Sequence, residues 1–243
     1  MIFVTSWDDG HPLDERVAEL LSRYGVQGTF YVPIRNREGR PVMSADALRR
    51  LAGADFEIGS HTLDHVYLTT CSPAAVDEQI GEGKARLEQS LGKRVDGFCY
   101  PGGKVNPAIR AAVRRAGFKY GRTIENMRSD LGTDPYCVPT GLQFFPHARR
   151  VLWTNFMRYG HYQKRARMFS LALAARPWWE RLPRIAEVLS DSDAVIHLWG
   201  HSWEVEEYGL WSELETTLER MAGLASERMG VGEVLARSQG ASV

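Results

Sequence analysis

Several features that would place a chain in a specialised class are scarce in this sequence. It has only three cysteines in 243 residues, Cys71, Cys99 and Cys137, and none belongs to a CxxC pattern. A disulfide framework and a thiolate zinc site are therefore not indicated. The 30 basic and 30 acidic residues balance, so the total charge gives no reason to expect a nucleic-acid partner.

Long apolar runs are also missing. No window approaches the roughly eighteen apolar residues of a membrane span, and the first residues, MIFVTSWDDG, do not form a secretion signal. We therefore expect a cytoplasmic protein. The glycine-rich signatures of nucleotide binding, GxGxxG and the P-loop, do not occur, and the sequence shows no internal repeat.

What is present is a regular alternation of short apolar runs and amphipathic stretches. The apolar runs predict strands at 2–7, 27–33, 56–60, 96–100, 119–124, 136–144 and 194–199. The amphipathic stretches predict helices at 12–24, 44–52, 73–91, 106–116, 160–173, 179–190 and 211–226. This order predicts an α/β fold, an irregular (β/α) barrel of about seven parallel strands, formed as a single domain over 1–243.

Polar clusters follow four of these strands: "SWDDG", "GSHTLDH", "YPGGK" and "HLWGHSWE". Because the loops after the strands of a parallel barrel gather at one face, we expect the four clusters to meet there. His61 and His65 are four residues apart, a spacing that places two imidazoles on one face of a helical turn. With one carboxylate from Asp8 or Asp9 they would make a three-ligand metal site with open positions.

These four clusters, in this order, resemble the successive motifs of the polysaccharide deacetylase family, carbohydrate esterase family four, whose members remove N- or O-acetyl groups from sugars. The resemblance covers about residues 3–204. It implies a barrel of about seven strands and a divalent metal, usually zinc, with nickel or cobalt as alternatives. Matched by position, Asp9, His61 and His65 would be the metal ligands and Asp8 the general base.

The two later motifs suggest an oxyanion contact and a general acid. In the "YPGG" loop, Tyr100, Gly102 and Gly103 would bring backbone N–H groups toward the substrate, although a plain turn is the other interpretation. In the last motif we assign the general acid to His201.

His197 and Glu204, which lie near His201 in the sequence, can each be interpreted in more than one way. His197 would be a supporting histidine or a satisfied core residue, and it is the second candidate for the acid. Glu204 would orient one of the two imidazoles. Trp199, Trp203 and Trp211 surround the motif and would stack on a sugar ring or pack in the core.

The sequence departs from the family pattern at the arginine that usually holds the catalytic aspartate. The third motif has Cys99 at that position, and the later strand that supplies the arginine in some members has Thr140. Arg122, on the predicted strand between them, is a candidate replacement. The competing interpretation is an ordinary surface arginine.

A basic, aromatic segment at about 145–190 is predicted as a helical insertion. Between His147 and Arg184 it has a single acid, Glu180, and its basic residues there are Arg149, Arg150, Arg158, Lys164, Arg165, Arg167, Arg176, Arg181 and Arg184. They are consistent with solvated helices, with binding of a phosphate- or lipid-linked sugar, or with contact to an anionic membrane. The sequence indicates no oligomeric state.

The predicted function is a metal-dependent carbohydrate deacetylase, which removes an N-acetyl or formyl group from a sugar. A candidate substrate is a phosphate- or lipid-linked intermediate of surface-glycan biosynthesis. Two alternatives stay open: a hydrolase of cyclic amides or ureides on the same fold, and a non-catalytic carbohydrate-binding relative.

Overall fold

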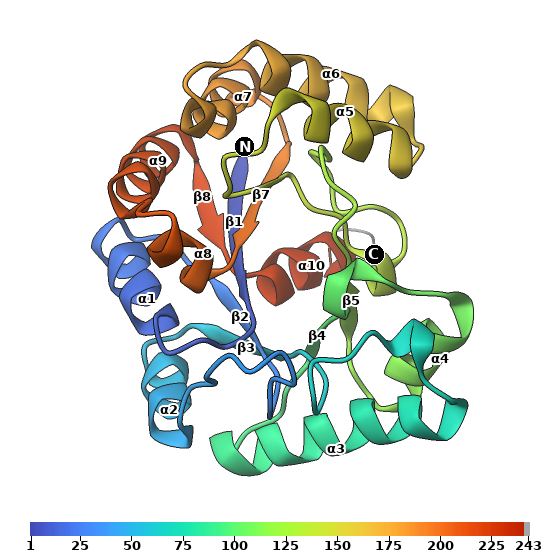
Figure 1. Cartoon of the computed structure of the whole chain (residues 1–243). Helices are drawn as coiled ribbons and strands as arrows, with labels where there is room; N and C mark the ends of the chain where they lie inside the picture. Colours follow the sequence, from blue (N-terminus) through green and yellow to red (C-terminus); the bar gives the residue numbers. More distant parts are fainter. Residues whose placement is uncertain (241–243) are drawn as a thin grey trace.

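A computed structural model describes residues 1–240 and shows one curled, parallel β-sheet surrounded by helices (Figure 1). The strands lie in the order β5-β4-β3-β2-β1-β7-β6, and β8 pairs with β1. Their bounds are β1 Ile2–Asp8, β2 Thr29–Val32, β3 Glu57–Ser60, β4 Gly97–Cys99, β5 Tyr120–Arg122, β6 Leu142–Gln143, β7 Val195–Gly200 and β8 Glu227–Met229. The predicted α/β barrel of about seven parallel strands is confirmed.

Strand β1 is the centre of the sheet because three strands pair with it. One edge pairs with β7 from Ile2 to Trp7. The other edge is divided: β8 pairs with its first half and β2 with its second half. The far edges of the sheet approach each other through the segment before β6, where Val138 forms a parallel bridge with Arg122 of β5. The sheet therefore curls into an irregular barrel that brings the strand ends to a common face.

The α-helices surround the sheet, and short 3-10 turns (η1 to η4) complete the connections. The α-helices are α1 Asp14–Arg23, α2 Ala45–Gly53, α3 Pro73–Leu91, α4 Pro107–Arg115, α5 Arg149–Arg158, α6 Tyr162–Ala174, α7 Arg181–Leu189, α8 Ser202–Glu207, α9 Trp211–Leu224 and α10 Val231–Gly240. None of the helices between residues 1 and 240 combines the length and hydropathy that a membrane span requires.

Helix α3 shows how local sequence sets these boundaries. The Ser72 hydroxyl accepts a hydrogen bond from the Ala75 N–H, and Pro73 occupies the first helical position, where its missing N–H costs nothing. Gly92 ends the helix in the left-handed conformation. The predicted bounds of 73–91 are confirmed.

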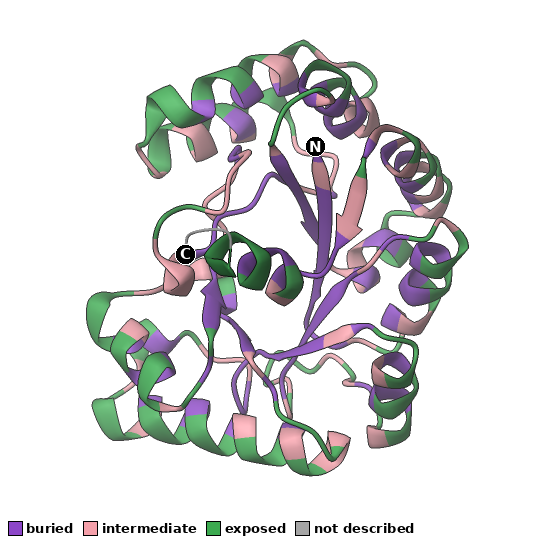
Figure 2. Ribbon diagram, turned by 180° about the vertical axis from the view of Figure 1, so that it is seen from behind, coloured by how far each residue is buried: buried purple, intermediate pink, exposed green. Residues whose placement is uncertain are grey.

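Two apolar clusters hold the fold together. The larger one lies between the sheet and the surrounding helices, and a smaller one includes Val4 and Tyr31 of the strands with Val234 and Leu235 of α10. Seen from behind, α10 lies in front of the strands with an exposed outer side (Figure 2). The C-terminal helix therefore covers one side of the barrel.

Four elements were not predicted: α5, α8, β8 and α10. In α5 only Leu152 is buried, so the helix has no apolar stripe for periodicity to detect. Strand β8 has three residues and α8 six, and both depend on tertiary contacts for their conformation.

Candidate metal and catalytic site

The two adjacent aspartates at the end of β1 are both buried, each with 3% of its surface exposed. Asp8 is the last residue of the strand, and the backbone then turns sharply through positive φ at Asp9 (77°) and Gly10 (59°). A Cβ on Gly10 would lie 2.6 Å from the Val32 side chain, so the turn requires glycine. The turn sends the two carboxylates to different neighbours.

Asp9 meets His61 and His65, as the sequence predicted. Its Oδ1 lies 3.0 Å from His65 Nε2 and 3.7 Å from His61 Nε2, and one ligand atom from each residue lies within 4.8 Å of the others. Ligands on a tetrahedral zinc ion stand about 3.3–3.6 Å apart. The Asp9 Oδ1 is also buried without a hydrogen-bond partner. An acceptor of this kind between two imidazoles fits a divalent cation.

The ring of His61 is oriented by a backbone carbonyl. Its Nδ1 lies 2.8 Å from the Cys99 carbonyl oxygen at the end of β4. A carbonyl can only accept, so Nδ1 carries the proton and Nε2 presents its lone pair toward Asp9. Burial lowers the pKa of His61 to about 4, which keeps the ring neutral, as metal coordination requires.

The segment that carries the two histidines is not helical, so the predicted helical turn is wrong. Residues 61–67 form an irregular loop, with positive φ at Thr62 (73°) and His65 (55°). The imidazoles converge because of this loop conformation, not because of helical periodicity. The spacing selected two imidazoles that do lie together, with ring centres 5.0 Å apart, but the helical reason given for it is incorrect.

Buried Asp64 fixes that loop. Its carboxylate accepts hydrogen bonds from Arg35 and Arg37 of the neighbouring loop and from Gln79 of α3. The Gln79 side chain in turn accepts from the Asp64 N–H at 2.9 Å. The histidine loop is thus held on both sides, which fixes the positions of His61 and His65.

Asp8 faces Arg122, the predicted candidate for the missing arginine. Arg122 Nη2 donates to Asp8 Oδ1, and the guanidinium is fully buried, so the surface-arginine interpretation is wrong. Burial lowers the pKa of Arg122, but the charge of Asp8 outweighs that effect and the pKa is raised overall. Cys99, where the family often has the arginine, places its Sγ 3.8 Å from Asp8 Oδ2.

Aromatic rings enclose the Arg122 guanidinium. Its Cζ lies 5.0 Å from the ring centre of Tyr31 and 5.2 Å from that of Trp199. Nε and Nη1 of Arg122 have no hydrogen-bond acceptor within the described residues. The orientation of this cation therefore depends on Asp8 and on the faces of the rings.

The structure separates the two histidines of the last motif. His201 follows β7, and its Nε2 lies 4.0 Å from Asp9 Oδ2, while its Nδ1 lies 2.7 Å from Glu204 Oε2. Burial lowers the pKa of His201, but the Glu204 hydrogen bond and nearby carboxylates raise it overall to about 9. His197 lies inside the barrel, 2.8 Å from the Ser6 hydroxyl, and burial lowers its pKa to about 3. His197 is therefore a satisfied core residue.

The partner of His201 is itself held by residues that the sequence reasoning did not identify. Gln143, at the end of β6, donates to Glu204 Oε2 at 2.9 Å, and its amide oxygen lies 2.9 Å from His147 Nε2. No local pattern marks Gln143 as functional, because only the pairing of β6 with β7 brings it beside α8.

The glycine loop after β4 is placed as expected, but it offers fewer free donors than predicted. Tyr100 has no free donor: its N–H donates to the Arg122 carbonyl and its hydroxyl to the Tyr136 carbonyl. The Gly103 N–H donates to the Tyr100 carbonyl. Gly102, with a φ of 60°, is left as the candidate oxyanion donor in this loop.

The three tryptophans near the last motif have separate environments. Trp199 is only 7% exposed, which leaves its ring no open face for a sugar. Trp211 lies under Arg16 and donates to Glu206. Trp203 donates its indole N–H to Asp9 Oδ2 at 2.9 Å, so it orients the Asp9 carboxylate directly. Of the two interpretations, core packing is the one that holds for Trp199.

Arg40, in the loop between β2 and α2, covers Trp203. Its Cζ lies 3.2 Å from the centre of the Trp203 ring. Within residues 1–240, Arg40 has no carboxylate partner. A guanidinium without a carboxylate partner therefore stacks on the side chain that donates to Asp9.

Part of the basic segment at 145–190 has a structural role. Arg165 is fully buried and donates to the carbonyl oxygens of Asn126, Phe156, Gly160 and Asn155. Arg181 is 9% exposed and donates to the His147 carbonyl. These two cations stabilise the fold of the segment and are not available to a ligand.

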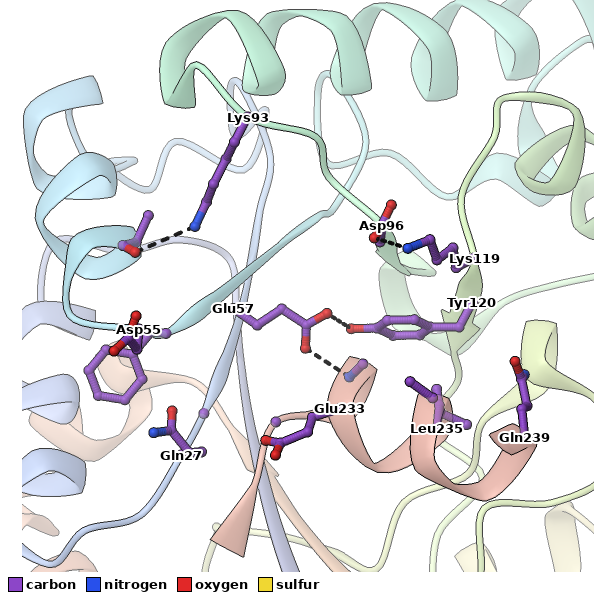
Figure 3. A pocket seen from close by; sticks show the side chains of 16 residues that line it. Gln27, Asp55, Glu57, Lys93, Asp96, Lys119, Tyr120, Glu233, Leu235 and Gln239 are labelled. Atoms are coloured by element: carbon purple, nitrogen blue, oxygen red, sulfur yellow. Dashed lines mark hydrogen bonds and ion pairs between the residues drawn. The ribbon is translucent and has the colours of Figure 1, made fainter. Parts of the chain in front are cut away.

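A cavity of about 550 Å³ lies away from this cluster, at the amino ends of β3 and β5 and beside α10 (Figure 3). Glu57 points into it, accepts from Tyr120 and Thr29, and also accepts from the Gly232 N–H at the start of α10. Lys119 is paired with Asp96 on another wall. These contacts fasten α10 to the barrel, and their donors and acceptors are already engaged.

Comparison with known families matches residues 2–121 to the polysaccharide deacetylase family. Among curated proteins, a peptidoglycan-N-acetylglucosamine deacetylase from Bacillus cereus is 28% identical over 120 residues, which are 49% of this chain and 54% of that protein. The chain spans about half the length of the curated relatives it matches.

Solved structures agree with the fold. A Mycobacterium smegmatis protein described as a polysaccharide deacetylase superposes with a TM-score of 0.68 at 14% identity, covering 100% of this chain and 91% of that one. A family 4 acetyl xylan esterase from Clostridium thermocellum, in complex with a cobalt ion, gives 0.63 at 16% identity, covering 98% and 92%. The sequence motifs, the family match over residues 2–121 and the fold together support membership of the polysaccharide deacetylase family, carbohydrate esterase family four.

Proposed function

We propose that this protein is a divalent-metal-dependent hydrolase that removes an N-acetyl or formyl group from a sugar. The observation that carries the proposal is the pair of aspartates at the end of β1. Asp9 lies beside the imidazoles of His61 and His65, and Asp8 forms an ion pair with the buried Arg122. Family membership supports carbohydrate deacetylation as the reaction class.

Asp9, His61 and His65 would hold the cation. Two imidazoles and one carboxylate suit zinc, and nickel or cobalt would accept the same donors. When bound, the cation supplies Lewis acidity toward an acyl oxygen and makes a nearby water more acidic. Trp203 and the Cys99 carbonyl hold two of the three ligands in place.

Asp8 would accept the proton of the attacking water. Arg122 fixes one of its carboxylate oxygens, so the other oxygen is directed away from the guanidinium. As the water oxygen bonds to the acyl carbon, negative charge develops on the acyl oxygen, and the Gly102 N–H would donate to it.

His201 would then give a proton to the leaving nitrogen as the C–N bond breaks. The products are a carboxylate and the free amine of the sugar. Glu204 on Nδ1 orients the ring so that Nε2 faces the cluster, and Gln143 holds Glu204.

For the substrate we propose a sugar that carries a phosphate, as a phosphate- or lipid-linked glycan intermediate does. The support is Arg40, an unpaired guanidinium beside the ligand-holding Trp203. If Arg40 binds that phosphate, Arg40→Gln should raise KM for a phosphorylated acetamido sugar at least tenfold. The same variant should leave KM for the phosphate-free sugar unchanged. An equal change in KM for the two sugars would refute the proposal that Arg40 binds a phosphate.

The test of the reaction is acetate or formate release from acylated amino sugars by metal-loaded protein, with a cyclic amide panel assayed in parallel. Release that depends on metal and is lost in Asp8→Asn would support the proposal. Turnover of cyclic amides alone would favour the ureide alternative. Sugar binding without turnover of any substrate would favour the non-catalytic one.

A further inference from the structure

Helix α5 has an outer face that combines arginines with large apolar side chains. Its exposed positions recur at one side of the helix and are Arg149, Arg150, Trp153, Thr154, Met157 and Arg158. Trp153 is 52% and Met157 58% exposed, and they lie one helical turn apart, between the arginines. We call this set, together with the adjoining Tyr162 of α6, the α5 surface.

Tyr162 extends the apolar part of the α5 surface. It is 46% exposed, and its hydroxyl donates to the Met157 carbonyl at 3.2 Å. Beneath the surface, Phe156 stacks on Phe169 at 4.2 Å, and Trp153 meets the edge of the same ring. The aromatic side chains are thus held in place with their outer parts exposed.

The charge of the α5 surface is not balanced by neighbouring acids. No Asp or Glu occurs from residue 135 to residue 179. Within the described chain, Arg149, Arg150 and Arg158 have no carboxylate partner. Glu125, which His161 contacts in the turn after α5, is already paired with Arg128.

Several exposed arginines on other helices differ in this respect, although Arg114 of α4 and Arg167 of α6 also lack a carboxylate partner within the described residues. Arg49 of α2 pairs with Asp46, Arg86 of α3 with Glu82, and Arg115 of α4 with Asp77. These three arginines are paired with acids on the surface. The α5 surface presents unpaired cations around an apolar centre.

We propose that the α5 surface docks on an anionic membrane. Arginines on a helix face are attracted to acidic headgroups, while tryptophan, tyrosine and methionine between them insert at the headgroup boundary. The helices α5 to α7 lie at the rim of the molecule, outside the barrel strands, so a flat partner can reach the α5 surface (Figure 1). This inference does not depend on the proposed deacetylation.

The test is co-sedimentation of the full chain with vesicles of phosphatidylglycerol and phosphatidylcholine, and with phosphatidylcholine alone. We expect binding to the anionic vesicles that weakens as salt is raised. The variant Arg149→Gln/Arg150→Gln/Arg158→Gln should bind about a hundredfold more weakly, since each arginine contributes to the attraction. Met157→Ser should weaken binding to a similar extent at low and at high salt.

The matched control is Arg49→Gln/Arg86→Gln/Arg115→Gln, which removes the same charge from other helices. This control should bind anionic vesicles within about twofold of wild type. An equal loss of binding in both triple variants would show that only the net charge of the protein matters, and would overturn the proposal. Absence of binding to anionic vesicles would also overturn it. Displacement by inorganic phosphate at constant ionic strength would point to a soluble phosphate ligand and contradict membrane docking.

Discussion

The barrel face and the α5 surface use the same residue types in opposite ways. At the barrel face, buried Arg122 is held by Asp8, and Trp203 donates to Asp9. On α5, Arg150 and Trp153 are exposed and the arginine has no acid to pair with. A buried charge must be matched inside the protein, so its partners indicate chemistry or structure. An exposed charge can be satisfied by water, so it is the combination of unpaired arginines with exposed apolar side chains that favours a partner from outside.

Of the substitutions predicted here, removal of the proposed proton acceptor Asp8 should have the largest effect on activity. Asp8→Asn should lower kcat by about 10²–10⁴-fold, because asparagine cannot take a proton from water. Metal content should stay at the wild-type level, because Asp9, His61 and His65 remain. Acetate release by Asp8→Asn at the wild-type rate would exclude Asp8 as the base.

Removal of the arginine beside Asp8 should have the next largest effect. Arg122→Met leaves a buried carboxylate unpaired and should lower the free energy of unfolding by about 3–5 kcal/mol. Arg122→Lys keeps the charge but not the planar donor geometry, and we expect kcat to fall about 10–100-fold with little change in KM. Urea denaturation and steady-state kinetics would measure the two effects, and a lysine variant with wild-type kcat would remove Arg122 from the positioning of Asp8.

Arg122 shows which parts of the site could be predicted from the sequence and which could not. The parallel barrel follows from the alternation of strand and helix patterns, and Asp8, Asp9, His61 and His65 were assigned by matching motifs directly after strands to those of a family. Arg122 could only be a candidate, because its contact with Asp8 depends on how the barrel closes near Val138. No local sequence pattern predicted a role for Gln143 or Arg40, because their partners lie on elements that are distant in the sequence. The non-helical histidine loop depends on Asp64 and its arginine partners, which periodicity does not record.

Trp203 and Trp211 allow the effect of an indole hydrogen bond to Asp9 to be tested against a matched control. Trp203→Phe removes the N–H that donates to Asp9 Oδ2 and should weaken zinc binding about tenfold or more. Trp211→Phe is the matched control, because that indole donates to Glu206 instead. Competition with a chromophoric chelator would measure both affinities, and equal values would show that Trp203 does not support the metal ligand.

The smallest expected effect is at the α5 surface. With a soluble acylated sugar and no vesicles, Arg149→Gln/Arg150→Gln/Arg158→Gln should keep kcat/KM within about twofold of wild type, as for other surface substitutions. A large loss in this assay would show that the α5 surface contributes to the reaction itself, and the separation of the two regions would fail.

Whether Asp9, His61 and His65 form a metal site is tested directly by the metal content of the purified protein, measured by mass spectrometry. Wild type should retain close to one zinc, nickel or cobalt ion per chain, and His61→Ala should retain almost none after the same dialysis. A wild-type protein that holds no metal after reconstitution, or a His61→Ala variant that holds as much as wild type, would contradict the account.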